Sequence, residues 1–156
     1  MRASVSARIP VAGLTVDEAT LREEETSADF PPQVPATARE GTRRNMLGEA
    51  LLDAASSPEI LLQSVALEAA PGDAGGDAGA LQVLARIAVT VRGQTHTITV
   101  PVSYRLAGGQ LTLTGESALR QSELGLTPFS ALLGALQVQD EMRVRFRIVA
   151  RAARSH

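Results

Sequence analysis

Apolar and polar side chains alternate along the second half of the chain with the period of two that predicts half-buried β-strands. Odd positions are apolar in residues 81–92, whereas in residues 96–106 the even positions carry His96 and the apolar side chains. This change of parity around Gly93-Gln94 indicates a short hairpin, and Gly108-Gly109 indicates the next one. The pattern therefore predicts antiparallel strands joined by tight turns.

Three further segments complete the predicted sheet. Residues 3–11 alternate and end near Pro10, which is typical of an edge strand, and residues 59–69 are apolar on both faces. The last strand places five apolar side chains on one face: Val138, Met142, Val144, Phe146 and Ile148. About six long strands in an antiparallel meander over residues 58–150 predict a mainly β fold, a barrel or a strongly curved sheet.

A helical excursion is predicted over about residues 15–55, between the first strand and the meander. Thr15-Val16-Asp17-Glu18 matches a capping box and predicts a short helix to about Glu25. Residues 27–38 contain three prolines and predict an extended linker. A second capping-box match, Thr37-Ala38-Arg39-Glu40, precedes an amphipathic face made by Met46, Leu47, Ala50 and Leu51. The glycine-rich segment 71–79 predicts a loop.

The predicted inner face of the sheet is aliphatic and almost free of aromatic side chains, which make up 3% of the chain. A small barrel either fills its interior with side chains or holds a ligand there, and small aliphatic residues favour a cavity. A dry, packed core remains the alternative. The residues expected to line the cavity are Ile87, Val89, Ile98, Val100, Val102, Leu111, Leu113, Val144, Phe146 and Ile148.

Composition excludes several kinds of chemistry. The 156 residues suit one domain and contain no cysteine, which removes disulfides, thiol catalysis and thiolate metal sites. No cluster has metal-ligand spacing, and no glycine motif predicts a nucleotide cofactor, so we expect no metal and no cofactor. His96 lies in phase with an apolar face, which favours a structural role over catalysis. We therefore expect no catalytic residues and no enzyme.

All 15 basic side chains are arginine, and they are unevenly distributed. Residues 1–79 hold 6 arginines and 13 acids, while residues 80–156 hold 9 arginines and 4 acids. The overall pI of about 5.7 argues against a nucleic-acid partner. Arg143, Arg145 and Arg147 predict a solvated outer face balanced by acids on a neighbouring strand, or else attraction to anionic lipid.

Arg43-Arg44 is expected to open a helix, where the helix dipole disfavours cations. This placement would be compensated by an anionic partner. Either an acidic side chain pairs with the two arginines, or they contact the headgroup of an anionic ligand.

The order of short motifs along the chain resembles the YceI family, and the resemblance covers most of residues 7–150. The motifs are Ile9-Pro10-Val11, Leu14-Thr15-Val16-Asp17, Arg43-Arg44-Asn45-Met46-Leu47, Leu51-Leu52-Asp53, Pro58-Glu59-Ile60, Val91-Arg92-Gly93-Gln94-Thr95-His96, Val100-Pro101-Val102, Leu119-Arg120-Gln121-Ser122-Glu123-Leu124-Gly125-Leu126 and Pro128-Phe129-Ser130. The resemblance implies a lipocalin-like antiparallel barrel that binds a polyisoprenoid or another long-chain amphiphile, and it implies no catalysis. The alternative function is a protein-interaction module with a packed barrel core.

Family members usually begin with a β-hairpin before the strand that matches residues 3–11, and some carry a G-H-x-H segment there. We therefore expect this single domain to be N-terminally incomplete, with unpaired strand edges that would invite a homodimer. The start of the chain lacks the apolar centre of a secretory signal, and no apolar run approaches the ~18 residues of a membrane helix. The chain as given predicts a cytoplasmic protein, and a missing upstream signal would make it periplasmic or secreted.

Overall fold

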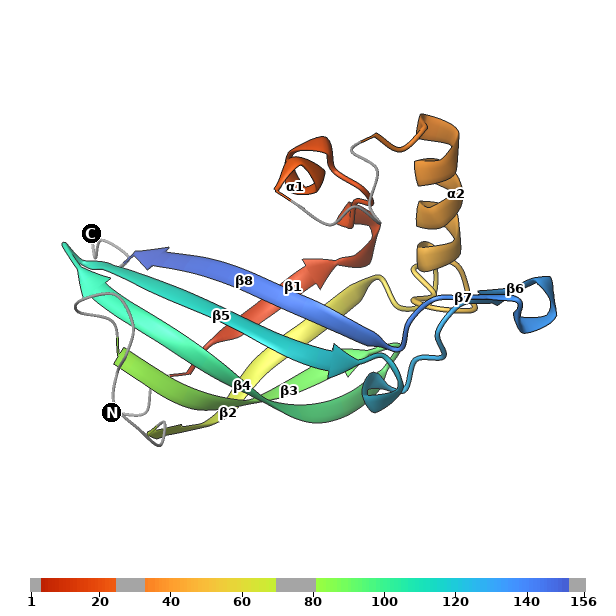
Figure 1. Cartoon of the computed structure of the whole chain (residues 1–156). Helices are drawn as coiled ribbons and strands as arrows, with labels where there is room; N and C mark the ends of the chain where they lie inside the picture. Colours follow the sequence, from red (N-terminus) through yellow and green to blue (C-terminus); the bar gives the residue numbers. More distant parts are fainter. Residues whose placement is uncertain (1–3, 25–32, 70–80, 152–156) are drawn as a thin grey trace.

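Six antiparallel strands form one sheet in the order β1-β2-β3-β4-β5-β8, and a two-stranded sheet, β6-β7, projects from one end (Figure 1). The computed structural model describes residues 4–24, 33–69 and 81–151. In chain order the elements are β1 (Ser6–Pro10), η1 (Val11–Gly13), α1 (Ala19–Glu23), α2 (Ala36–Leu47), β2 (Glu59–Ala69), β3 (Leu81–Val91), β4 (Gln94–Ala107), β5 (Gln110–Arg120), η2 (Ser122–Leu124), β6 (Ser130–Ala131), η3 (Leu132–Gly134), β7 (Leu136–Gln137) and β8 (Glu141–Arg151). The prediction of a mainly β antiparallel meander is confirmed.

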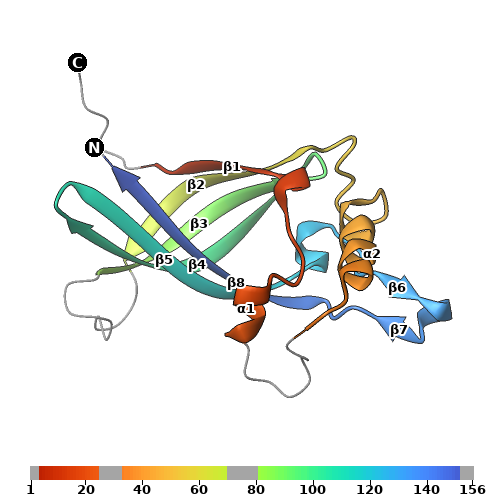
Figure 2. The same cartoon turned by 90° about the horizontal axis from the view of Figure 1, so that it is seen from above.

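The main sheet is curled into a half-barrel, and α1 and α2 lie at the same end as the β6-β7 hairpin (Figures 1 and 2). β1 and β8 are the two edges of the sheet in the described part of the chain. The two tight turns follow from local sequence, because Arg92 and Gly93 have φ of 50° and 72° and Gly108 and Gly109 have 56° and 74°. Positive φ at both central residues is the geometry that joins right-twisted strands.

The sheet forks beside Pro101, where β5 separates from β4. β4 pairs with β5 only from Val102 to Ala107, and from Gln94 to Pro101 it pairs with β3 alone. Proline has no N–H to donate, so the β4-β5 ladder ends where the proline begins. The connection after β5 fills the fork, where Leu124 and Leu126 are buried in one cluster with Val11, Leu52, Val89 and Val91. This cluster closes the helical end of the half-barrel.

Both predicted capping boxes are wrong. Thr15 donates its hydroxyl to the Glu18 carboxylate instead of capping a backbone N–H, and the chain bends at Asp17, whose φ is 51°. The first helix, α1, therefore starts only at Ala19. The second, α2, begins at Ala36 immediately after Pro35, a residue that lacks an N–H and precedes helices readily, so Thr37 lies inside its first turn.

Two other expectations change at this end of the molecule. Arg43 and Arg44 lie near the C-terminal end of α2 rather than its start, and the helix dipole therefore favours them there. Val138 does not belong to the last strand, since it precedes β8 and is 51% exposed. Half of the predicted linker 27–38, residues 27–32, and the whole predicted loop 71–79 lie outside the described residues, and residues 36–38 are helical.

Candidate ligand-binding groove

The concave face of the half-barrel holds a cavity of about 350 Å³, at the end away from the buried leucine and valine cluster. All six strands of the main sheet contribute to it, and both edge strands face it. The lining is Val5, Ala7, Leu62, Gln63, Ser64, Leu67, Val83, Ala85, Ile87, Val102, Tyr104, Leu111, Leu113, Phe146 and Ile148. It contains no charged side chain, so this groove is suited to an apolar molecule.

Small residues create the space. Ala85 on β3 lines the groove and is 4% exposed, and a larger side chain there would take up part of the cavity. Phe146 pairs with Gly115 across β5 and β8, and its ring covers the glycine. A Cβ at Gly115 would lie 2.4 Å from the Phe146 Cζ atom, so the bare glycine is what lets the ring lie flat against the sheet.

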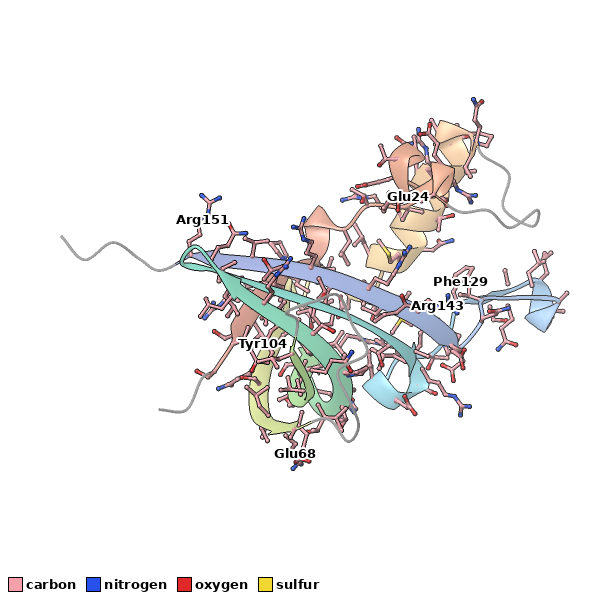
Figure 3. The ribbon with its side chains drawn as sticks, turned by 60° about the vertical axis from the view of Figure 1, so that its left-hand side comes forward. Glu24, Glu68, Tyr104, Phe129, Arg143 and Arg151 are labelled. Carbon is pink, nitrogen blue, oxygen red and sulfur yellow. The ribbon has the colours of Figure 1, made fainter. Side chains whose placement is uncertain are left out.

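The polar groups of the lining are few, and one of them is already occupied. The Ser64 hydroxyl accepts the Val5 N–H at 2.8 Å, while the Ser64 N–H donates to the Val5 carbonyl at 2.8 Å. These two bonds extend the pairing of β1 with β2 beyond Ser6. Gln63 and Tyr104 complete the polar part of the lining, and Figure 3 shows Tyr104 on the part of the sheet that lies away from the helices.

The structure brings six of the ten predicted lining residues to the cavity: Ile87, Val102, Leu111, Leu113, Phe146 and Ile148. The other four lie elsewhere. Val89 is buried in the cluster that closes the helical end, and Val100 is buried beside Ala85 and Val102. Ile98 packs against both clusters, and Val144 is 37% exposed.

Nine lining residues were missed, and two signals could have found most of them. Val5, Ala7, Val83, Ala85 and Tyr104 occupy the alternating positions already assigned to the inner face of their strands. Leu62 and Leu67 were hidden because β2 is apolar on both faces. A bulge between Ser64 and Ala66 also reverses the parity of β2, so even positions face inward before it and odd positions after it.

Arg43 and Arg44, the predicted headgroup residues, do not line the cavity. Arg43 Nη2 donates to the Ala12 carbonyl at 2.6 Å, and Arg43 Nε donates to the Leu14 carbonyl at 3.1 Å. Arg43 therefore fixes α2 to the segment that follows β1. Arg44 is exposed in the last turn of α2.

The strand arginines face outward along β8. Arg143 Nε lies 3.4 Å from Glu116 Oε1 on β5, and both side chains are more than half exposed. For Arg143 this is the neighbouring-strand pairing that the alternation predicted, and at such exposure it contributes little to stability. A second hollow, of about 430 Å³, lies beside Glu116, at Pro101 and Gly115. This second hollow is open to solvent, and its lining mixes Glu116 and Arg145 with apolar residues. We favour the apolar groove as the candidate site because its lining is mostly apolar and contains no charged side chain.

His96 is partly buried on β4, and its Nε2 atom hydrogen-bonds no described residue. Gly125, with φ of 70°, lies against it: a Cβ there would be 3.0 Å from His96 Nε2 and 2.8 Å from Gln94 Oε1. Within residues 4–24, 33–69 and 81–151 no three His, Asp or Glu side chains gather as metal ligands would. None of the helices in those ranges is long and apolar enough to cross a bilayer.

An antiparallel sheet curled around an apolar cavity defines the class of barrel folds that can hold one hydrophobic ligand. The chain belongs to the YceI family, since the model of the YceI-like domain matches residues 1–150. This family is known for binding polyisoprenoids, and its members are generally binding proteins rather than enzymes. No curated protein sequence matches the chain.

Solved structures show the same fold. BcnA of Burkholderia cenocepacia matches with a TM-score of 0.55 and 23% identity over 71% of this chain. The YceI protein of Campylobacter jejuni matches with a TM-score of 0.61 and 9% identity over 97% of this chain. The chain spans 64% of BcnA, less than two-thirds of its length, and 74% of the Campylobacter protein.

Proposed function

We propose that the protein binds a polyisoprenoid or a similar long-chain amphiphilic lipid in the groove, as a carrier and without catalysis. The observation that carries this proposal is the uncharged cavity of about 350 Å³, walled mainly by apolar side chains of six strands. Its volume is at the lower end of ligand pockets, which run from about 300 to 1,000 Å³. Burial of the hydrocarbon supplies the affinity, at roughly 25 cal/mol per Å² of apolar surface before the costs of binding.

The lining also decides how such a lipid lies. Because no charged side chain faces the cavity, an anionic headgroup stays outside it, in water. Val5 and Ala7 on β1 and Phe146 and Ile148 on β8 face the same cavity, and these edge strands are not paired with each other. A chain longer than the cavity can therefore extend between the two edges.

The test compares two substitutions on one strand. Ala7→Leu adds bulk to a side chain that faces the cavity, whereas Ser6→Leu adds the same bulk to the opposite face of β1. Each variant and the unchanged protein are titrated with farnesol and with a long prenyl alcohol while Tm is measured. We expect a Tm that rises with lipid concentration for the unchanged protein and Ser6→Leu, and a much smaller rise for Ala7→Leu.

Native mass spectrometry of the gently purified protein provides a second readout, the mass of a co-purified lipid. No adduct and no concentration-dependent rise in Tm with either lipid would contradict the proposal and favour a protein-interaction module. An equal rise for all three proteins would place the lipid outside the groove. A periplasmic or secreted location remains part of the proposal and is tested by fractionating cells that express the gene from its native promoter.

A further inference from the structure

The segment between β5 and β8 projects from the helical end of the molecule as a narrow hairpin that the groove does not use (Figures 1 and 2). We call residues 128–139 the leucine hairpin. It is held together by the β6-β7 pairs Ser130 with Gln137 and Ala131 with Leu136, and by the Val138 N–H, which donates to the Phe129 carbonyl at 2.9 Å.

The leucine hairpin presents large apolar side chains to solvent, with Leu132 and Leu133 at its tip. Leu132 is 71% exposed, Leu133 is fully exposed, Leu136 is 60% exposed and Val138 is 51% exposed. No charged residue occurs from Leu124 to Gln139. Single exposed leucines are ordinary on protein surfaces, but four neighbouring apolar side chains on a projecting, uncharged hairpin indicate an interaction site.

The backbone holds two of these leucines in a costly conformation. Leu132 and Leu133 have φ of 52° and 56°, the left-handed region that ordinary L-residues avoid. Glycine or asparagine at the same positions would remove most of that cost. The exposed side chains of Leu132 and Leu133 contribute nothing to core packing. A strained backbone at this tip therefore indicates that the two side chains serve another purpose.

The base of the leucine hairpin is fixed to the main sheet. The Gln121 side chain, only 7% exposed, donates through Nε2 to the Gln139 carbonyl at 2.8 Å. Asp140 accepts the Ser122 N–H at 2.8 Å and the Ser122 hydroxyl at 2.6 Å. These bonds to η2 orient the hairpin, so its tip is held away from the protein.

We propose that the leucine hairpin docks the protein on a lipid bilayer by inserting Leu132 and Leu133 at the boundary of headgroups and acyl chains. Three observations favour a bilayer over a protein partner. The hairpin is narrow and projects from the molecule (Figures 1 and 2), the exposed apolar residues at its tip are leucines rather than the tryptophan, tyrosine and arginine that dominate protein interfaces, and no charged residue lies between Leu124 and Gln139 to oppose insertion into an apolar phase. The proposal goes beyond ligand binding in the groove and does not depend on it.

The first experiment is flotation with vesicles of phosphatidylcholine alone, so that insertion rather than charge is measured. The double variant Leu132→Asn/Leu133→Asn removes the apolar tip but suits the left-handed backbone, so it keeps the fold. We expect at least a tenfold fall in the partition coefficient for this variant, from the apolar surface of two leucines. Leu21→Asn, a 59% exposed leucine of α1, is the matched control and should bind as the unchanged protein does.

The second experiment uses the absence of tryptophan from the chain. Leu136→Trp places a single reporter in the leucine hairpin, and Leu21→Trp places one on α1. On adding vesicles, the emission of Leu136→Trp should shift to the blue and be quenched by brominated lipid, while Leu21→Trp should not change. Ala7→Leu, the groove variant, should still float, which separates this proposal from the proposed function.

Three outcomes would overturn the proposal. One is that the unchanged protein does not float, and another is that Leu132→Asn/Leu133→Asn floats equally well. The third is a concentration-dependent dimer in analytical ultracentrifugation that disappears in this double variant, since a second copy would then be the occupant of the tip.

Discussion

Gly115 and Phe146 are cross-strand partners on β5 and β8, and the phenyl ring occupies the space where any other residue at position 115 would place its Cβ. That Cβ would also lie 2.9 Å from the Pro101 carbonyl oxygen, which belongs to the backbone at the fork of the sheet. The ring can turn away, but the carbonyl cannot easily move.

We therefore expect Gly115→Ala to destabilise the protein by about 1–3 kcal/mol, the usual cost of overpacking. Gly41→Ala is the control, because Gly41 lies inside α2, where an alanine methyl would meet nothing within 4 Å beyond the adjacent backbone of its own helix, and alanine is favoured in a helix by about 1 kcal/mol. Urea denaturation should give opposite signs for the two substitutions. Equal effects would show that Gly115 is not crowded.

Arg43 and Arg44 allow a similar comparison on α2. Arg43→Met removes two charged hydrogen bonds to the carbonyls of Ala12 and Leu14, and we expect it to lower the free energy of unfolding by about 1 kcal/mol. Arg44→Met should change it by less than about 0.5 kcal/mol, because Arg44 is exposed. If both arginines instead contact a headgroup, both variants would weaken lipid binding with little change in stability.

The carboxylate of Asp140 makes the base of the leucine hairpin sensitive to acid. Hydrogen bonds from the Ser122 hydroxyl and then the Ser122 N–H lower the pKa of Asp140 below its usual value of 3.8. A lowered pKa means that the ionised group stabilises the folded state above about pH 4 and that this contribution is lost as the pH falls through the folded-state pKa. The stability difference between the unchanged protein and Asp140→Asn should therefore be constant from pH 5 to 7 and should shrink below pH 4. A difference that is the same at pH 3 and pH 7 would show that the charge of Asp140 is unimportant.

The strained tip gives a prediction about stability that is independent of membranes. Leu133→Gly relieves the left-handed strain without burying or exposing a core group, so it should raise the free energy of unfolding by up to about 1 kcal/mol. Leu136→Gly, on β7 with ordinary backbone angles, should lower it instead. Thermal unfolding of the two variants measures both effects, and a loss of stability in Leu133→Gly would mean that the side chain packs.

The sequence was most informative where structure is local. Alternation and the glycine turns predicted β3, β4 and β5 within a few residues, because each turn is specified by its own two residues. The two capping boxes failed for a local reason as well, since Thr15 binds Glu18 directly and Pro35 starts α2 without a cap. Resemblance to the YceI family was confirmed over residues 1–150.

The groove was only partly predictable because two of its determinants are not local. Alternation identifies which side chains share a face, and six of the predicted residues do line the cavity. Alternation does not show where along that face the core is filled. It therefore could not distinguish Val89 and Val100, which are buried in the core clusters, from the residues that line the cavity. The bulge of β2 after Ser64 and the contribution of Val5 and Ala7 from the far edge became clear only from the pairing of the strands.

The leucine hairpin projects from the helical end of the half-barrel (Figure 1), and the groove lies further along the strands, away from that end. Along β8 the first lining residue, Phe146, comes five positions after Glu141, roughly 17 Å further from the hairpin. A molecule resting on a membrane by its hairpin therefore holds its cavity in the water, out of reach of the lipids beneath it. Together with the proposed function, this geometry predicts that the protein leaves the membrane before it exchanges its lipid with that membrane.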